Sequence, residues 1–339
     1  MSRSKPESAS SWKRIVGASS SGTAGSPKRA RRVLTDEDER FLRDIEKTHL
    51  ANDPSVEDLF GETQDLEPIG EKASLREYLK ELWQRRHFIW RESKNKVLNQ
   101  TSNTFLGPLW LVLNPLLLAA FYWVIFGIVL GVSRGMDNFV AFIIIGILMF
   151  RFSSGAIGQS TKAIASSRSM IKAFSYPRAA IPISLVVREM LGQFIVMAVM
   201  LVMILVIPPH VSVDATWLLV PLVFVSHILI NFGFAFFFSR IGYKLPDFSQ
   251  AMSFITRLLM YGSGVIFPVE RFLQHEPALS IVKANPIYIL LDAYRSILME
   301  NAVPPPSTWW NLAGWGFGLA ICGFIYFWRG EEEYAREQR

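Results

Sequence analysis

The pattern of hydrophobic and polar residues divides the chain into four parts. Residues 1–73 carry no sustained apolar period, 74–105 mix apolar and basic residues, 106–328 hold long apolar runs, and 329–339 are polar again. The apolar runs are about 20 residues long, as in helices that cross a bilayer, and they lack the short alternation of barrel strands. The pattern predicts an all-α integral membrane protein with a disordered, cytoplasmic N-terminal tail and a short cytoplasmic C-terminal tail.

Hydropathy predicts six transmembrane helices within the apolar part. They cover residues 106–132, 138–159, 180–207, 217–238, 248–267 and 309–328. Basic residues gather before the first span, between the second and third, and between the fourth and fifth. The short linkers VSRGMD and PPHVSVDA on the other side hold one basic residue between them. This asymmetry predicts that both termini are cytoplasmic.

The stretch before the first span predicts a helix that lies on the membrane surface. Residues 74–96 place Leu, Trp, Phe and Ile among Arg and Lys at helical spacing. The span itself opens with Gly-Pro and Asn-Pro steps, and proline removes a backbone hydrogen bond from a helix. We therefore expect an interface helix followed by a hinge or gate, built from Gly107, Pro108, Trp110, Asn114 and Pro115.

A second unusual segment separates the fifth and sixth spans. Residues 285–301 form an amphipathic pattern that is too short and too charged to cross a membrane alone. It predicts an extracytoplasmic helix that packs on the bundle or dips into it. Asn285, Pro286 and Arg295 belong to this segment, and its apolar face comprises Ile287, Leu290, Leu291, Tyr294 and Leu298.

The cytoplasmic linker 161–178 predicts another short amphipathic helix, which Pro177 ends. Such a helix either lies idle on the bilayer or enters a groove of a partner protein. We favour the second interpretation, because a transporter driven from outside the membrane needs a lever of this kind. The residues expected to couple this chain to a partner are Arg168, Met170, Lys172, Phe174 and Tyr176.

Composition and motifs narrow the function. The net charge of +6 needs no nucleic-acid partner, because the basic residues lie mostly beside the spans. The sequence contains no phosphate-binding loop and no Cys/His set with metal-ligand spacing, so we expect no catalytic, cofactor-binding or metal-binding residues. If ATP powers transport, another chain supplies it.

Charged residues inside the predicted spans are the main candidates for a substrate path, since each costs a few kcal/mol at the bilayer centre. They are Arg151, Arg188, Glu189 and Arg257, a positive excess. One hypothesis is that the arginines bind an anionic group, such as the pyrophosphate of a lipid carrier. The alternative is structural pairing with Glu189 and with carbonyls at helix ends.

Aromatic residues of the first span are candidates for the same path. Rings that face a conduit stack on the apolar faces of sugars and leave the hydroxyls to water. The residues considered for this role are Phe121, Tyr122 and Phe126.

Together these segments resemble the membrane subunit of polysaccharide ABC exporters, the ABC-2 family that moves lipid-linked O-antigen, capsule, teichoic acid or galactan. The resemblance covers about residues 75–328. Residues 121–152 look most like the actinobacterial branch that exports lipid-linked galactan. The motifs that carry the resemblance are LGPLWLVLNPLL, SYPR, FFFSRIGYKLPDF, GVIFPVERF and NPIYILLDAYRSIL.

The resemblance implies a homodimer in a bacterial inner (plasma) membrane, surrounded by membrane lipid and joined by two ATP-binding cassette subunits that hold ATP and Mg. It also implies that 74–96 is the interface helix, that 161–176 is the coupling helix and that 267–301 contains the gate helices, with Asn285, Pro286 and Arg295 as gate residues. Two other classes remain as alternatives, an ion-coupled transporter and a membrane-bound transferase. The first should show midplane carboxylates in paired broken helices, and the second should show clustered Asp, Glu or His.

Overall fold

A computed structural model describes residues 74–99, 105–129, 138–168, 171, 177–269, 276–331 and 333–335. Secondary structure in these ranges is helical and includes no strand. The predicted tail at 1–73 lies outside them. The predicted all-α architecture is therefore confirmed for the part of the chain that the structure describes.

The interface segment forms two helices, α3 (Leu75–Gln84) and α4 (Arg86–Asn99), so the prediction of one continuous helix was wrong. Ser74 begins α3 with a capping box, in which its hydroxyl accepts from the backbone N–H of Glu77. The chain turns at Arg85 because the two helices pack on different parts of the molecule. Helix α3 buries Tyr78, whereas α4 buries Ser93, whose hydroxyl donates to a carbonyl of α8 (Ala180–Val206) at 2.9 Å.

The first span changes helix type along its length. It starts with the 3-10 turn η3 (Gly107–Leu109), continues as α5 (Trp110–Tyr122) and ends as the π-helix η4 (Trp123–Val129). Gly107 has φ +49°, a left-handed conformation that favours glycine. The Gly-Pro step thus lies in a 3-10 turn at the start of the span, and Pro115 lies inside α5; the hinge stays a prediction.

Five helical segments of the described chain are long and apolar enough to cross a membrane: Gly107–Phe126, Phe139–Ser166, Ala180–Val206, Ala215–Lys244 and Pro306–Trp328. They contain α5, α6 (Phe139–Ser166), α8, α9 (Val220–Lys244, preceded by the 3-10 turn η5 at Ala215–Leu219) and α14 (Pro306–Trp328). The remaining predicted span is α10 (Phe248–Gly262), whose 15 residues cover about 22 Å, less than the roughly 30 Å hydrocarbon core. The count of six spans stays a prediction.

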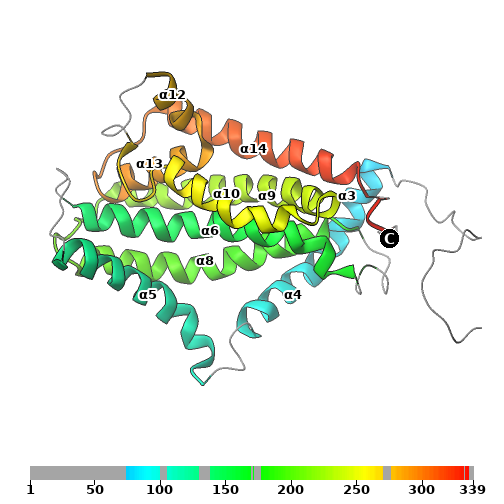
Figure 1. Ribbon diagram of the computed structural model, residues 1–339, viewed down its shortest axis with the longest axis horizontal. Helices are drawn as coiled ribbons and strands as arrows, with labels where there is room; N and C mark the ends of the chain where they lie inside the picture. The colour runs from blue at the N-terminus through cyan, green and yellow to red at the C-terminus, as the bar shows by residue number, and fades with distance from the viewer. Residues whose placement is uncertain are drawn as a thin grey trace, which may run out of the picture. The chain divides into compact units, whose positions relative to one another are not determined.

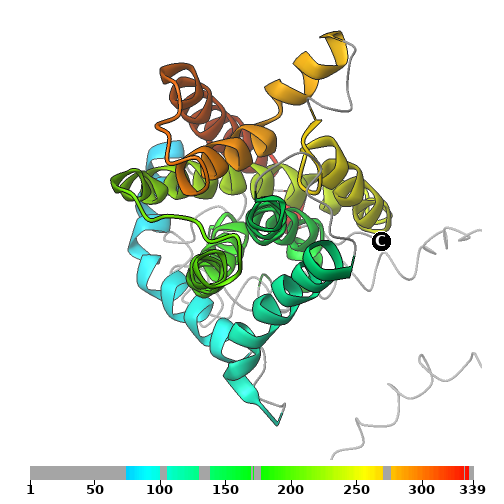
Figure 2. The same cartoon turned by 90° about the vertical axis from the view of Figure 1, so that its left-hand side faces the viewer.

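Helix α6 forms the centre of the bundle. It packs against α8, α9, α10 and α13 (Pro286–Leu298), as the end-on view of Figure 2 shows. In the most apolar 18-residue stretch of α6, 78% is buried inside the protein, whereas only 11% of the corresponding stretch of the first span is buried. Helix α6 is therefore held by contacts inside the chain, whereas most of α5 faces outward.

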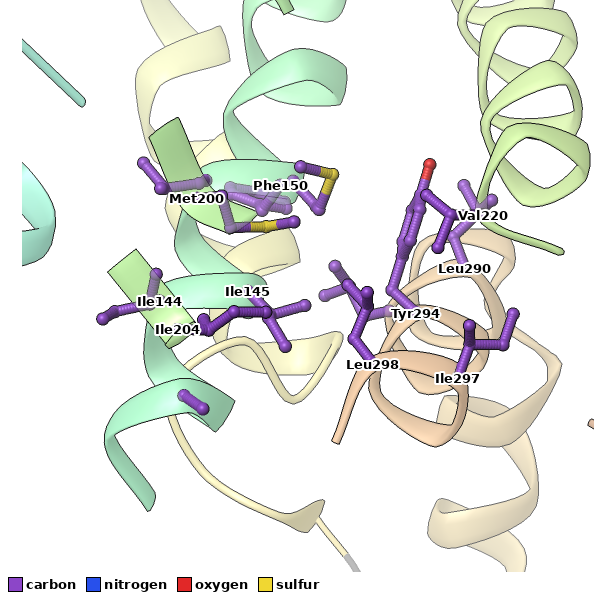
Figure 3. Packing of buried hydrophobic residues seen from close by; sticks show 14 of the residues in the cluster. Ile144, Ile145, Phe150, Met200, Ile204, Val220, Leu290, Tyr294, Ile297 and Leu298 are labelled. Atoms are coloured by element: carbon purple, nitrogen blue, oxygen red, sulfur yellow. The ribbon is translucent and has the colours of Figure 1, made fainter. Parts of the chain in front are cut away.

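Helix α13 confirms the amphipathic helix predicted between the last two spans. It lies with α12 (Glu276–Ala284) at one end of the bundle (Figure 1). In the close view of Figure 3, its Tyr294 and Leu298 point into the cluster formed by Ile145 of α6 and Val220 of α9. All five residues of its predicted apolar face are buried.

The polar residues of this region anchor α13. Asn285 caps the helix and donates from its amide to the hydroxyl of Ser263 at 2.9 Å. Arg295 is buried and donates to the carbonyls of Gly264 and Val265, each at 2.9 Å. Its guanidinium also lies 3.4 Å from the ring centroid of Phe142. The predicted gate residues Asn285 and Arg295 thus hold α13 against α6 and against the loop after α10.

At the other end of the bundle, the C-terminal segment is tied to α3. The hydroxyl of Tyr78 donates to Glu331 at 2.7 Å and accepts from the backbone N–H of Ala179 at 2.9 Å. Arg178 binds the same carboxylate through its backbone N–H at 2.9 Å. Burial raises the pKa of the Glu331 carboxyl and also the pKa of Tyr78. We call Tyr78, Arg178 and Glu331 the C-terminal clasp.

Replacing Tyr78 with Phe should destabilise the protein. The change leaves the buried N–H of Ala179 and the carboxylate of Glu331 without their hydroxyl partner, which typically costs about 1–3 kcal/mol. Thermal unfolding in detergent measures the effect, with Tyr261→Phe, at a residue 52% exposed, as the control. Equal unfolding temperatures for the two variants would contradict a structural role for the clasp.

Candidate functional site

A cavity of about 670 Å³ lies between α5, α6, α8 and α10. It brings together side chains that are far apart in the sequence and includes all three arginines singled out above. Its polar and aromatic lining comprises Trp110, Asn114, Tyr122, Phe150, Arg151, Phe152, Ser154, Gln159, Arg188, Glu189, Gln193, Ser253, Thr256 and Arg257. We call it the central cavity.

One of the three arginines is paired within the protein. Arg188 donates to the side-chain oxygen of Gln159 and lies 3.4 Å from Glu189. The amide nitrogen of Gln159 donates to the same Glu189 oxygen at 2.8 Å. The alternative interpretation, structural pairing with Glu189, therefore holds for Arg188.

The other two arginines leave positive charge in the cavity. Neither guanidinium, of Arg151 or of Arg257, forms an ion pair or a hydrogen bond with another described residue. Both residues are exposed in the isolated chain, whereas Arg188 and Glu189 are half-buried. The central cavity thus has a net charge of +2, with two guanidiniums available to a ligand.

Some of the hinge and aromatic candidates line the central cavity, and others do not. Trp110, Asn114, Pro115 and Tyr122 line it, but Gly107 and Pro108 do not. Phe121 and Phe126 are also outside its lining. Neighbouring residues on a helix do not face the same way, and Phe126 packs against Phe139 with ring centroids 5.8 Å apart. Of the three aromatic residues, only Tyr122 is placed to meet a cavity ligand.

The coupling candidates fall at the edge of the described chain. Residues 161–166 belong to α6, so the prediction of a separate helix starting at Thr161 was wrong. Arg168 follows the end of α6 and is exposed. Met170, Lys172, Phe174 and Tyr176 lie outside the described residues.

Sequence reasoning missed three residues that shape this site. Gln159 links Arg188 to Glu189, and Gln193 donates to the carbonyl of Leu148 at 3.2 Å. Gly155 makes room for Glu189, because a Cβ at this position would lie 2.8 Å from the Glu189 carboxylate. The available signal was spacing, since Arg151, Gly155 and Gln159 recur every four residues and therefore share one helix face.

His227 serves packing inside the bundle. It is buried, and its Nε2 lies 2.8 Å from the hydroxyl of Ser153, between α9 and α6. In the described ranges no group of three or more His, Cys, Asp or Glu residues is arranged to hold a metal. The histidine does not extend the cavity site.

Chemically, the central cavity suits an anion. Guanidiniums bind phosphate oxygens through paired, charge-assisted hydrogen bonds, which strengthen away from bulk water. The hydroxyls of Ser154, Ser253 and Thr256 also line the cavity, but each donates to a backbone carbonyl of its own helix, so the guanidiniums are the donors for an anion. Binding, rather than bond-making chemistry, is what these side chains support.

The comparisons with known proteins agree with this picture. Residues 86–299, more than half of the chain, match the family described as ABC-2 type transporter. The O-antigen export system permease protein RfbA of Myxococcus xanthus is 25% identical over 76% of this chain and 97% of its own length. The protein of the same name from Klebsiella pneumoniae is 25% identical over 59% of this chain and 76% of its own. The chain therefore belongs to the ABC-2 type transporter family of membrane proteins.

Proposed function

We propose that this chain is the channel-forming permease subunit of an ATP-driven exporter that moves a lipid-linked polysaccharide from the cytoplasm to the cell exterior. The observation that carries the proposal is the central cavity, where Arg151 and Arg257 present unpaired positive charge between the helices. A polyprenyl-pyrophosphate carrier supplies the matching anion. The relatives named as O-antigen export permeases support a glycan cargo.

Lipid-linked galactan is the first candidate cargo. Residues 121–152, which resemble the actinobacterial galactan exporters, include Tyr122 and Arg151 of the cavity lining. Lipid-linked teichoic acid and O-antigen are the alternatives, because the cavity chemistry addresses the phosphate that they share. Depleting the protein and identifying the lipid-linked glycan that accumulates inside the cell distinguishes among them.

The proposed assembly contains two copies of this chain and two ATP-binding subunits in the inner (plasma) membrane, with both termini in the cytoplasm. Three exposed apolar residues of α3 (Leu75, Leu79 and Trp83) support its contact with membrane lipid, as expected of an interface helix. The segment after α6, starting near Arg168, is the proposed contact with the ATP-binding subunit.

The geometry favours this proposal over the two other classes. An ion-coupled transporter needs free carboxylates near the midplane, but Glu189, the one carboxylate in the described lining of the central cavity, is bound to Arg188 and Gln159. A transferase needs clustered acids and bases, and the cavity offers mainly cations and hydroxyls.

Reconstitution provides the direct test. The chain is co-purified with its ATP-binding subunit, and ATP-dependent movement of a polyprenyl-pyrophosphate glycan across vesicles is measured. The proposal expects transport that requires both subunits and ATP. Absence of a complex together with ATP-independent movement would overturn it.

Replacing Arg151 or Arg257 with Gln should reduce transport strongly, by about tenfold or more each, because a charge-assisted hydrogen bond contributes roughly 1.5–3 kcal/mol. Initial rates of glycan movement in the reconstituted vesicles measure the effect at matched protein amounts. Arg76→Gln on α3 removes the same charge outside the cavity and should keep wild-type rates. Wild-type rates in both cavity variants would rule out an anion site.

Gly107→Leu should impair transport while leaving membrane insertion intact. The left-handed φ of +49° strains any residue with a Cβ, and nothing lies within 4 Å of that Cβ, so the effect comes from the backbone and not from crowding. Gly107→Asn is the matched control, because asparagine tolerates this conformation better and should retain more transport. Equal transport by the Leu variant and the wild type would refute the hinge.

A further inference from the structure

A smaller cavity of about 230 Å³ lies beside the central cavity, between α4, α6 and α8. Its charged lining consists of Lys96, Lys162 and Arg188, and no carboxylate is among its described lining residues. Lys96 also pairs with Glu92 at 2.7 Å on α4, while Lys162 forms no ion pair with a described residue. We call this space the basic side cavity.

The two cavities meet at two shared residues. Gln159 and Arg188 line both of them. These residues and Glu189 are joined by hydrogen bonds, so a small polar cluster separates the two spaces. An anion that passes from one cavity to the other has to displace the partners of Arg188.

One face of α6 runs past both cavities. Arg151 and Gly155 line the central cavity, Gln159 lines both, and Lys162 lines the basic side cavity. Their spacing of four, four and three residues keeps them on the same face. Lys162 follows Arg151 by 11 positions, which correspond to about 16 Å of helix. The two cations therefore lie at the ends of a polar stripe that is roughly half as long as the hydrocarbon core.

The size and lining of the basic side cavity select its ligand. Its volume is below the roughly 300–1,000 Å³ of typical small-molecule sites, which suits a phosphate or diphosphate and excludes a sugar chain. Its wall combines the cations with apolar Ile181 and Leu185. Helix α4 borders it and exposes the large apolar side chains of Phe88 and Trp90, which suit contact with lipid, so a head group still attached to its membrane lipid is the expected source of that phosphate.

We infer that the basic side cavity is the loading site for the phosphate head group of the lipid-linked cargo, and that Gln159, Arg188 and Glu189 form the gate to the central cavity. This inference rests on the proposed function. The head group first meets Lys96 and Lys162. It then replaces Glu189 and Gln159 as the partner of Arg188 and reaches Arg151 and Arg257.

The competition at Arg188 has a consequence for affinity. As long as Glu189 neutralises Arg188, the gate binds an added anion weakly. Removing that carboxylate, or pushing it aside, should free the guanidinium and strengthen anion binding. Gly155→Ala pushes it aside without changing charge, because the added Cβ would lie 2.8 Å from Glu189. Gly158→Ala on the same helix is the matched control, because it adds the same methyl group at a position where no atom lies within 4 Å of the added Cβ.

Binding to the full-length chain in lipid nanodiscs tests the loading site. The probe is a polyprenyl diphosphate in the nanodisc lipid, and a parallel arm uses inorganic diphosphate in solution. Lys162→Gln should weaken binding of the lipid probe about tenfold, Lys162→Arg should restore it, and Lys96→Gln should weaken it less because Lys96 is shared with Glu92. Lys80→Gln, outside both cavities, controls for the loss of one charge.

The gate is tested with the same probe. Glu189→Gln and Gly155→Ala should both tighten binding severalfold, whereas Gly158→Ala should leave it unchanged. If all three variants and the wild type bind the lipid probe with equal affinity, Gln159, Arg188 and Glu189 do not form a gate.

The outcomes separate the two levels of the proposal. If Lys96→Gln and Lys162→Gln leave lipid binding unchanged while Arg151→Gln abolishes it, the loading site is wrong and the proposed function stands. If these variants weaken binding of the soluble diphosphate but not of the lipid probe, the basic side cavity binds a free anion and the inference is also wrong. If the wild type neither binds the lipid probe nor moves the glycan with ATP, the proposed function fails.

Discussion

The arrangement depends on the burial of α6 among the helices that surround it, α5, α8, α9, α10 and α13. A polar group on such a helix must find a partner in the protein or face a cavity, since an unsatisfied polar group in hydrocarbon costs several kcal/mol. Ser160 and Thr161 meet this condition by donating to carbonyls within α6, and Ser153 pairs with His227. The polar residues that remain, from Arg151 to Lys162, gather on the face beside the cavities. The position of the site is thus a consequence of how α6 packs.

The walls of the central cavity differ in how firmly they are held. Helices α6 and α8 belong to the buried core. Helix α5 supplies Trp110, Asn114 and Tyr122 to the lining but is largely exposed along its apolar length. The span that contains α5 begins at the left-handed Gly107 and ends as the π-helix η4. Helix α10, which supplies Arg257, buries only Met252. The cavity therefore has two well-packed walls, α6 and α8, and two largely exposed walls, α5 and α10.

The sequence predicted those parts of the fold that depend on local pattern. Apolar length located the five long helices, and helical periodicity identified the buried face of α13, including Tyr294 and Leu298. The break at Arg85 was not predicted, because it arises when α3 and α4 pack on different partners. The extension of α6 to Ser166 was missed for a similar reason, since Ile164 is buried by tertiary contacts that the hydropathy pattern does not contain.

The candidate site was predictable by residue type but not by pairing. Charge inside apolar runs was enough to single out Arg151, Arg188 and Arg257, which share one cavity. The ion pair of Arg188 with its sequence neighbour Glu189 was considered from the sequence. The contact of both residues with Gln159 of α6 was not, because it depends on the distance between α6 and α8, which the sequence pattern does not reveal.

The anchoring of Arg295 sets a limit on motion at the far end of the bundle. Its guanidinium occupies space that Gly146 leaves open, between the ring of Phe142 and the carbonyls of Gly264 and Val265. If α13 withdrew alone, a charged group would lose these partners within an apolar surrounding, which is strongly unfavourable. These contacts favour joint movement of α13, α6 and the loop after α10. A change that widens this end of the bundle is therefore expected to move these three elements together, or to displace α12 alone.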